Sequence, residues 1–572
     1  MKAFTEPLLS LVGFEEMTKT AEKSSGLISV TGCIDAQKSQ MIYAFGGHRK
    51  NKLIVTFGEQ KAKELYDEYS FFDKEVVYYP SKDVLFYQSD IRGNLLTAER
   101  IRALKAIREQ ERVTLVTTFD ALMNTMAPIE KMWENVLTLE QGQLLDLKEI
   151  QAALIRMGYE KEYQVQTMGQ FSVRGGILDV FPLTEENPIR IELWGDEIDT
   201  IRYFDCESQK SIENTDRVSI YPAAELVLSD EEKAGGIDKL KAEAKRVSDK
   251  LRKQMKTEEA HRVTVMADEL TEEWGELSMY AGMDAFLSYF FDERVGILDY
   301  FNPSDSLIFF DELTRCVEQG KLTETEFSES MKQRLAMGYI LPGQMNGLFT
   351  EKEIVAKLEK YSCIALGALD NKANGLRQLG SYGIHCQSVS PYNNSFELLI
   401  KDLKRYKKNG YRVILLSGSR TRAKRLSEDI TDQGITCFYT ENYDHELSQG
   451  QIMVCYGKVR RGFEYPILKF AVITESDIFG AQQKKKKRHR IYEGEKIQSF
   501  TDLSVGDYVV HENHGLGIYR GIEKLEVDKK VKDYIKIEYQ GGSNLYILAT
   551  QLDMIQKLSL IHISEPTRRS YI

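Results

Sequence analysis

Short runs of β-branched residues alternate with stretches of helical periodicity in the first quarter of the chain. The runs lie at 27–32, 52–57, 75–79 and 113–118. Residues 98–110 combine good helix formers with apolar residues at helical spacing, which predicts a helix with one face on a sheet. Strands that alternate with helices are typical of a parallel sheet covered by helices, so we predict a parallel α/β domain here.

The rest of the chain changes pattern several times. At 572 residues it is too long for one hydrophobic core, since cores stop growing near about 250–300 residues. Turn-separated strands from about residue 137 predict a mainly antiparallel insert, and charge-rich helices follow from 229 to 279. A buried run at 305–313 then predicts that the insert splits the first α/β domain.

The predicted fold is therefore multi-domain α/β, with a split, degenerate P-loop (RecA-like) domain, a mainly β insert, a second small α/β domain and a C-terminal small β barrel. Strands at 411–417, 451–457 and 470–476 predict the second α/β domain. The expected boundaries are 1–130 and 229–350 for the split domain, 131–228 for the insert, 351–482 for the second α/β domain, 483–500 for a basic linker and 501–557 for the barrel.

Charge and cysteine usage exclude several classes of protein. The formal charge of −11 means that any nucleic-acid contact has to come from a local basic patch. The basic run at 484–490 has no interleaved aromatics and is better explained as a solvated linker. Seven cysteines without a C-x-x-C pair predict neither disulfides nor a metal site and fit a reducing cytosol. No stretch is long and apolar enough for a membrane span, so no membrane association is predicted.

One segment has the position of a phosphate-binding loop. Residues 31–39 follow a strand and precede a helix, and they match G-x-x-x-x-G-K-[ST] at Gly32, Lys38 and Ser39. The second glycine is replaced by Gln37, whose Cβ restricts the backbone and crowds an anion, and Asp35 adds a repelling charge. An ordinary strand-to-helix turn explains the same residues equally well.

Asp311 and Glu312 end the buried run at 305–313. An Asp that holds magnesium and a Glu that orients water occupy such a place in P-loop ATPases, although paired acids are also common at strand ends. No Q-x-x-G-R-x-x-R pattern for an arginine finger occurs. We predict that this chain is not catalytic and has no cofactor of its own; the alternative is a slow ATPase that uses Lys38, Ser39 and both acids.

Several segments in series resemble bacterial transcription-repair coupling factors. They are FSVRGGILDVFPL, NPIRIELWGDEIDTIRYFD, GILDYFNPSDSLIFFDEL, GDYVVHENHGLGIYRGIEKLEV and DYIKIEYQGGSNLYILATQLDMIQK. The first third is also similar to the excinuclease subunit UvrB. The resemblance implies a degenerate nucleotide site, an insert that binds UvrA, a CarD-like or Tudor-like barrel that binds the RNA polymerase β subunit, and a following motor that uses ATP and Mg²⁺ to move along double-stranded DNA.

The resemblance also implies roles for individual residues. Arg174, Arg190 and Trp194 match the positions with which the family's insert holds UvrA, and two guanidinium groups beside an aromatic ring suit a binding hot spot. Alternatively, Arg174 braces a turn and Trp194 fills the core of the insert. Leu525 matches the apolar position that contacts polymerase, and on sequence alone it is an ordinary strand residue.

Residues 558–572 depart from the family pattern and are expected to be a non-native tail. The function expected from the resemblance is recruitment of UvrA to stalled RNA polymerase in the cytoplasm, which links transcription to nucleotide excision repair. A stand-alone polymerase-binding regulator built on residues 501–557 is the further alternative.

Overall fold

The computed structural model describes residues 1–46, 49–82, 94–276, 283–369, 375–480, 495–496, 506–511, 515–527, 530–539, 544–548 and 555–557. The chain forms two compact units, Met1–Leu85 with Leu96–Met279 and Asp284–Gln482, and Phe86–Leu95 with Tyr280–Met283 and Gln483–Ile572. The expected basic linker is described only at 495–496. The expected tail at 558–572 lies outside the described residues.

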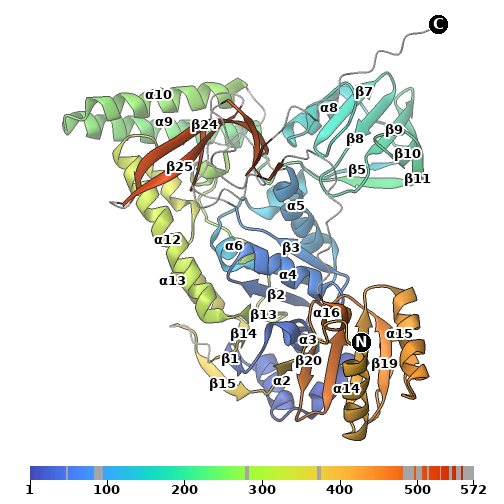
Figure 1. The fold of residues 1–572 in the computed structure, drawn as a ribbon. Helices are drawn as coiled ribbons and strands as arrows, with labels where there is room; N and C mark the ends of the chain where they lie inside the picture. The colour runs from blue at the N-terminus through green and yellow to red at the C-terminus, as the bar shows by residue number, and fades with distance from the viewer. Residues whose placement is uncertain are drawn as a thin grey trace. The chain divides into compact units, whose positions relative to one another are not determined.

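A seven-stranded parallel sheet lies at the centre of the first unit (Figure 1). In spatial order its strands are β15 (Gln378–Gly383), β1 (Gly26–Thr31), β14 (Ser362–Leu366), β13 (Ser306–Asp311), β2 (Asn51–Thr56), β4 (Val113–Thr118) and β3 (Val76–Tyr79). The four strands predicted in the first quarter of the chain are confirmed. The buried run at 305–313 joins the same sheet as β13, between β14 and β2, so one sheet is built from two distant parts of the sequence.

The start predicted for the second α/β domain, residue 351, is wrong. Strands β14 and β15 both pair with β1 of the first sheet, in the registers Gly26 to Ser362 and Thr31 to Gly383. The helix before them, α13 (Glu351–Leu358), leads into β14. A short apolar run has the same appearance whichever sheet it joins, and the choice of partner strands is made by backbone pairing in the folded chain.

Helices connect these strands and cover the sheet. The helix predicted at 98–110 is confirmed as α5 (Asn94–Glu109), which buries Ala98, Ile101 and Leu104 at helical spacing. The other helices of this part of the chain are α1 (Lys2–Thr5), η1 (Glu6–Ser10), α2 (Phe14–Lys23), α3 (Asp35–Gly46), α4 (Glu59–Tyr69), α6 (Phe119–Met123), α7 (Ile129–Glu134), η2 (Met283–Phe286), α11 (Leu287–Phe290), η3 (Ile297–Tyr300), α12 (Leu313–Ala336) and η4 (Pro342–Gly347).

The insert has a sheet and a core of its own. Its six strands, in spatial order, are β11 (Ser211–Asn214), β10 (Glu197–Phe204), β9 (Ile189–Trp194), β8 (Ile177–Val180), β7 (Gln170–Arg174) and β6 (Glu160–Lys161). All neighbouring pairs are antiparallel except β6 with β7, which confirms the predicted arrangement. The helix α8 (Leu147–Arg156) and the pair of β5 (Leu137–Glu140) with β12 (Arg217–Ile220) complete the core.

Two long helices follow the insert and lie side by side (Figure 1). They are α9 (Asp230–Lys253) and α10 (Thr257–Glu276), which confirm the helical stretch predicted from 229 to 279 as far as residue 276; residues 277–279 lie outside the described residues. Ser229 caps the N-terminus of α9 in a capping box with Glu232, because each side chain accepts a hydrogen bond from the backbone N–H group of the other residue. Within the described ranges, no helix combines the length and apolar character that a membrane span requires.

The second sheet of the first unit has the order β16 (Gln387–Ser388), β20 (Phe463–Tyr465), β21 (Phe470–Thr474), β17 (Arg412–Ser417), β19 (Ile452–Tyr456) and β18 (Phe438–Tyr439). Its helices are α14 (Phe396–Lys408), α15 (Arg420–Asp432) and α16 (Glu475–Phe479). The strands predicted at 411–417, 451–457 and 470–476 are confirmed. The α/β pattern was thus correct here, although the domain begins later than predicted.

The second unit contains one further sheet. Its strands, in spatial order, are β22 (Glu495–Lys496), β27 (Ile555–Lys557), β23 (Tyr508–His511), β24 (Gly515–Val527), β25 (Lys530–Glu538) and β26 (Asn544–Leu548). Val509, Ile535 and Ile537 are fully buried in its core. No pairing between β22 and β26 closes the sheet among the described residues, so the barrel stays a prediction.

A buried ion pair attaches the end of the insert to the first sheet. Arg100 of α5 is fully buried and donates from Nε and Nη2 to the Glu225 carboxylate (2.7 and 3.1 Å). Its Nη1 donates to the Pro80 carbonyl oxygen at 2.6 Å. Burial alone would raise the pKa of Glu225, but the charges of Arg100 and Lys82 outweigh burial and lower the pKa to about 2.

We predict that Arg100→Met strongly destabilises the first unit. The variant leaves the buried Glu225 carboxylate without the guanidinium group that donates to both of its oxygens. This loss costs about 3–5 kcal/mol, so the protein should unfold at a lower urea concentration. The pKa of Glu225 is lowered from its ordinary 4.5, so ionised Glu225 stabilises the wild-type fold fully above pH 4.5. Wild type loses this stabilisation as the pH falls from 4.5 toward 2, and it is this stabilisation that Arg100→Met removes. Lys105→Met is the control.

Lys105 pairs with Glu185 at 2.9 Å, and both side chains are about a quarter exposed. Removal of such a pair should cost at most about 1 kcal/mol. Equal destabilisation by the two variants would contradict the special role of Arg100.

Candidate functional site

The loop that resembles a phosphate-binding loop is short and closed by the chain itself. Residues 32–34 connect β1 to α3. Gly32 has a φ of +78°, and a Cβ there would lie 2.1 Å from the Ile384 carbonyl oxygen, so only glycine fits. The backbone N–H groups of Gly32 and Cys33 donate to the carbonyl oxygens of Ala368 and Gly367 (3.2 and 3.0 Å). Two donors that would hold a phosphate are therefore already bonded.

Gln37 and Ser39 are enclosed by protein. Their exposed fractions are 0% and 1%, and neither the Gln37 amide nor the Ser39 hydroxyl finds a hydrogen-bond partner among the described residues. A hydroxyl that binds magnesium has to face the metal and its nucleotide, and Gln37 stands where a phosphate loop needs glycine. The residues present do not fit a bound nucleotide with its magnesium ion.

Lys38 lies at the centre of a cluster of acids. Its Nζ donates to Asp311 Oδ1 at 2.5 Å, to Glu312 Oε1 at 3.0 Å and to Asp35 Oδ1 at 3.1 Å, and the side chain is 1% exposed. The second oxygen of Asp311 accepts from Thr56 Oγ1 at 2.9 Å. The structure thus brings together Lys38, Asp311 and Glu312, as the sequence pattern predicts, but the lysine donates its hydrogen bonds to the two acids.

The charges of this cluster offset each other in part, since two lysines pair with three acids. Burial lowers the pKa of Lys38, but the charges of Asp311, Glu312 and Asp35 outweigh burial and hold the pKa above its ordinary value. Asp35 was expected to repel a phosphate; it pairs instead with Lys38 and, at 2.8 Å, with Lys61. Burial alone would raise the pKa of Asp35, and these lysines lower it to about 2.

In a working ATPase the lysine contacts phosphate and the acid contacts magnesium. Here they form a buried ion cluster.

We predict that Lys38→Met mainly destabilises the fold. It leaves Asp311, which is 2% exposed, without a cation, and the expected cost is about 3–5 kcal/mol in urea unfolding. Lys61→Met is the control, because its partner Asp35 has a side chain that is 69% exposed and the expected cost is at most about 1 kcal/mol.

The same variants test for a bound nucleotide. ATP with Mg²⁺ should leave the melting temperature of wild type unchanged, since a ligand that bound the folded state would raise it. A rise that disappears in Lys38→Met would contradict this reading and favour the slow ATPase.

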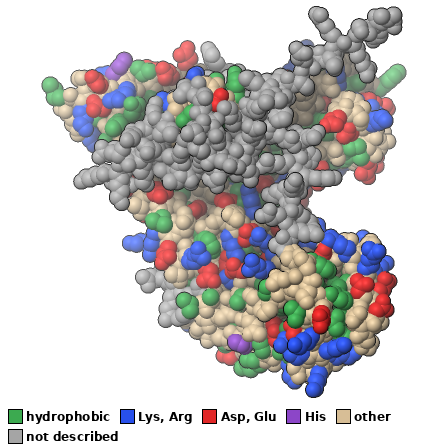
Figure 2. Space-filling view, in the orientation of Figure 1, with side chains coloured by type: hydrophobic (Ala, Val, Ile, Leu, Met, Phe, Trp, Pro, Cys, Tyr) green, Lys and Arg blue, Asp and Glu red, His purple; other side chains and the backbone are tan. Residues whose placement is uncertain are grey.

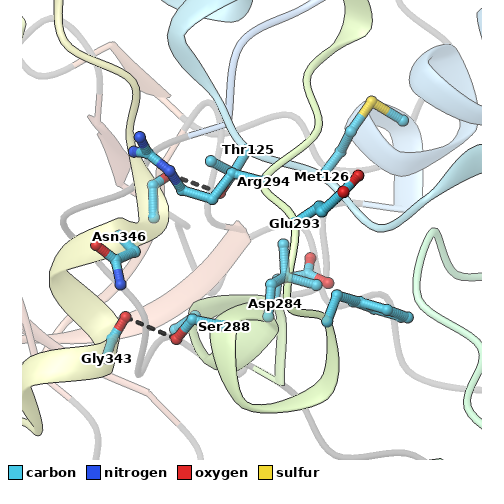
Figure 3. Close-up of a pocket in the computed structure, with 12 residues that line it drawn as sticks. Thr125, Met126, Asp284, Ser288, Glu293, Arg294, Gly343 and Asn346 are labelled. Atoms are coloured by element: carbon cyan, nitrogen blue, oxygen red, sulfur yellow. Dashed lines mark hydrogen bonds between the residues drawn. The ribbon is translucent and has the colours of Figure 1, made fainter. Parts of the chain in front are cut away.

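A small hollow lies beside η4, α11 and the end of α6 (Figure 3). Its volume is about 20 Å³, close to the space for one water molecule. Ser288 Oγ donates to the Gly343 carbonyl oxygen at 2.8 Å, and Thr125 Oγ1 donates to that of Gly347 at 2.9 Å. Hydrogen bonds that span the hollow, together with its size, indicate a structural gap and no ligand site.

In the insert, one buried acid holds both arginines of the predicted UvrA site. Asp179 of β8 is 1% exposed and lies opposite Arg190 of β9 in the sheet. Its oxygens accept from Arg190 Nε and Nη2 at 2.7 and 2.9 Å and from Arg174 Nη2 at 2.8 Å. The Arg190 guanidinium also lies 4.3 Å from the centre of the Phe204 ring. Both arginines are therefore fixed in place before any partner binds.

Trp194 lies at the exposed end of the same strand. Arg190, Glu192 and Trp194 occupy alternate positions of β9 and so share one face of the sheet, whereas Ile189 and Ile191 are buried on the other. Trp194 is 84% exposed, which excludes the alternative that it fills the core of the insert.

The indole of Trp194 borders an open hollow of about 660 Å³. Acids outnumber cations in its lining, which consists of Glu140, Gln141, Gly142, Trp194, Glu197, Ile198, Asp199, Asp216 and Arg217. Arg174, which braces the β7–β8 hairpin through Asp179, is about one third exposed and can serve both as brace and as contact. Asp179 itself was missed by sequence reasoning; the signal was a lone acid inside the apolar strand ILDV.

Leu525 lies on β24 and pairs with Lys532 of β25 in the backbone register. Its side chain is outside what the structure describes, so its contact with polymerase stays a prediction. The structure places it on the longest strand of the second unit.

Comparison with known proteins relates both of these regions to described domains. Residues 137–226 match the family described as UvrB interaction domain, and residues 503–559 match the CarD-like/TRCF RID domain. The chain is 30% identical over 507 residues to the transcription-repair-coupling factor of Bacillus subtilis (strain 168), a match that covers 88% of this chain and 42% of the relative. The chain is therefore similar to transcription-repair-coupling factors over most of its own length.

Other transcription-repair-coupling factors match over a similar length. The protein of Staphylococcus haemolyticus (strain JCSC1435) is 29% identical over 93% of this chain and 45% of its own length. The protein of Staphylococcus aureus (strain USA300) is 29% identical over 95% of this chain and 46% of its own length. The chain thus spans less than half the length of these curated relatives.

Proposed function

We propose that this chain belongs to the transcription-repair-coupling factor family and acts as a recruitment platform. In this proposal its insert binds UvrA, its C-terminal β domain binds the β subunit of RNA polymerase, and the two contacts link stalled transcription to nucleotide excision repair in the cytoplasm. The observation that carries the proposal is the presence, in one chain, of a UvrB interaction domain at 137–226 and a CarD-like/TRCF RID domain at 503–559.

The geometry of the insert supports a protein-binding role. Hot spots of protein interfaces are enriched in Trp and Arg, and preorganised side chains lose less entropy when a partner binds. Asp179 fixes Arg174 and Arg190, and Trp194 presents its ring on the same face of β9 as Arg190. A partner that covers this face gains apolar burial on Trp194 while both guanidinium groups stay paired.

We assign no nucleotide chemistry to the Lys38 cluster. Its lysine is bonded to three acids, and Gln37 and Ser39 are enclosed. We therefore propose that ATP, Mg²⁺ and movement along double-stranded DNA, which the family resemblance implies, are not functions of residues 1–557. The slow ATPase remains the alternative enzyme hypothesis, and it requires this cluster to open.

We predict that Trp194→Ala weakens UvrA binding by about tenfold or more in calorimetric titration, because an exposed hot-spot aromatic typically contributes at least about 2 kcal/mol. This variant is cleaner than Arg190→Glu, which would place a second carboxylate beside that of buried Asp179. Tyr163→Ala is the matched control, because Tyr163 is also an exposed aromatic of the insert (83%) but follows β6 at the far edge of the sheet. Equal affinity of Trp194→Ala and wild type would refute the assigned surface.

We predict that Leu525→Ala reduces capture of the RNA polymerase β subunit in a pull-down and leaves UvrA affinity unchanged. The reason is that Leu525 and Trp194 belong to different compact units of the chain. Trp194→Ala should behave in the opposite way, so each variant is the control for the other. Loss of both partners in either variant would indicate misfolding and not two separate docking sites. A chain that binds polymerase but never UvrA would support the stand-alone regulator.

A further inference from the structure

The α9–α10 hairpin is strongly basic around its connecting turn. Residues 241–262 contain eight Lys and Arg against four Asp and Glu, in a chain whose net charge is −11. The rest of α10, residues 263–276, has five acids and no Lys or Arg. Positive charge is therefore concentrated in the half of the hairpin that contains the turn. We call this half the basic tip.

Seven cations of the basic tip are exposed and make no ion pair with a described residue. They are Lys241, Lys245, Arg246, Lys250, Arg252, Lys253 and Lys256. The space-filling view shows Lys and Arg side chains on the visible face of this helix pair (Figure 2). Mutual repulsion of unpaired like charges is unfavourable in the free protein, and an anionic partner would relieve it.

The helix dipole explains only part of this charge. A helix C-terminus favours cations, but the effect falls off within the last turn. Lys250, Arg252 and Lys253 lie in the last turn of α9, whereas Lys241, Lys245 and Arg246 lie before it and Lys256 lies beyond it. The helix dipole therefore does not account for the other four of the seven exposed cations.

The six cations on α9 form two rows on its solvent-facing half. Lys241, Lys245 and Arg252 recur on one line along the helix, and Arg246, Lys250 and Lys253 recur on a second line about a third of a turn around the helix. The face opposite these rows buries Leu240, Ala244 and Leu251. From Lys241 to Arg252 the helix rises about 16 Å, a length over which duplex DNA carries roughly ten phosphate charges.

The turn adds an apolar side chain at the end of the rows. Met255 has a left-handed backbone, with φ at +62°, and is 85% exposed between Lys253 and Lys256. Methionine at the end of a basic element is one of the side chains that minor-groove proteins insert between base steps.

We propose that the basic tip binds the phosphate backbone of double-stranded DNA without sequence preference. The residues of this site differ from those of the proposed UvrA and polymerase surfaces. The site would give residues 1–557 a DNA contact of their own. The overall acidic charge of the chain did not indicate such a contact, and the sequence pattern offered only the basic run at 484–490 as a candidate.

The test uses the full chain and a fluorescein-labelled duplex of about 30 base pairs, followed by fluorescence anisotropy at several salt concentrations. The triple variant Lys250→Gln, Lys253→Gln and Lys256→Gln removes charge without placing acids at a helix C-terminus. We expect it to weaken binding about tenfold or more at about 50 mM salt. It should also reduce the slope of log K against log salt by about 3, because each phosphate contact contributes about 0.9.

The chain offers a matched control on another helix. Lys404, Lys407 and Lys408 are exposed near the C-terminus of α14, and their change to Gln removes the same charge from the same kind of site. We expect this control to keep its affinity within about threefold and its salt slope unchanged. Equal losses in both triple variants would show that only net charge matters and would overturn the proposal.

Two further outcomes would also overturn it. One is no binding of the duplex by wild type at low salt. The other is displacement of the duplex by polyglutamate of equal charge as readily as by unlabelled DNA, which would identify the tip as a site for an acidic protein.

Discussion

The contact between Lys38 and Asp311 connects the two parts of the sequence from which the central sheet is built. Lys38 lies on α3, directly after the first strand, and Asp311 ends β13, on the other side of the insert in the sequence. Both side chains are almost fully buried, so neither charge can be left alone without a large loss of stability. The ion pair therefore stabilises the sheet in the observed order, because loss of either partner would leave the other charge buried and unpaired.

The same requirement changes what the residues can do. A lysine and an aspartate in these positions have the chemistry that P-loop ATPases use on phosphate and magnesium. When the lysine is bonded to Asp311, Glu312 and Asp35, the groups satisfy one another and the site is closed. A second buried pair, Arg100 with Glu225, attaches the end of the insert to the sheet. The insert can then present its polar face, with Trp194 exposed, from a rigid base.

Much of the fold could be predicted because buried strands and amphipathic helices have strong local patterns. The strands of both α/β sheets, helix α5 and the antiparallel insert belong to this class. The boundary at 351 failed because β14 and β15 are short and their partner, β1, lies more than 300 residues earlier in the sequence. Local pattern carries no information on which distant strand a segment pairs with. The positions of the site residues were named in advance, but the exposure of Trp194 and the role of Asp179 were not.

The sequence by itself determined the classes of elements, the order of the domains, the loss of the second glycine at Gln37 and, through resemblance, the family. Only the tertiary structure decided that Lys38 is enclosed by acids, that Asp179 holds both arginines and that seven cations of the basic tip pair with none of the described acids. The physical reason is that ion pairing and burial depend on distances between residues that are far apart along the chain. Those distances exist only after the strands have paired and the helices have packed.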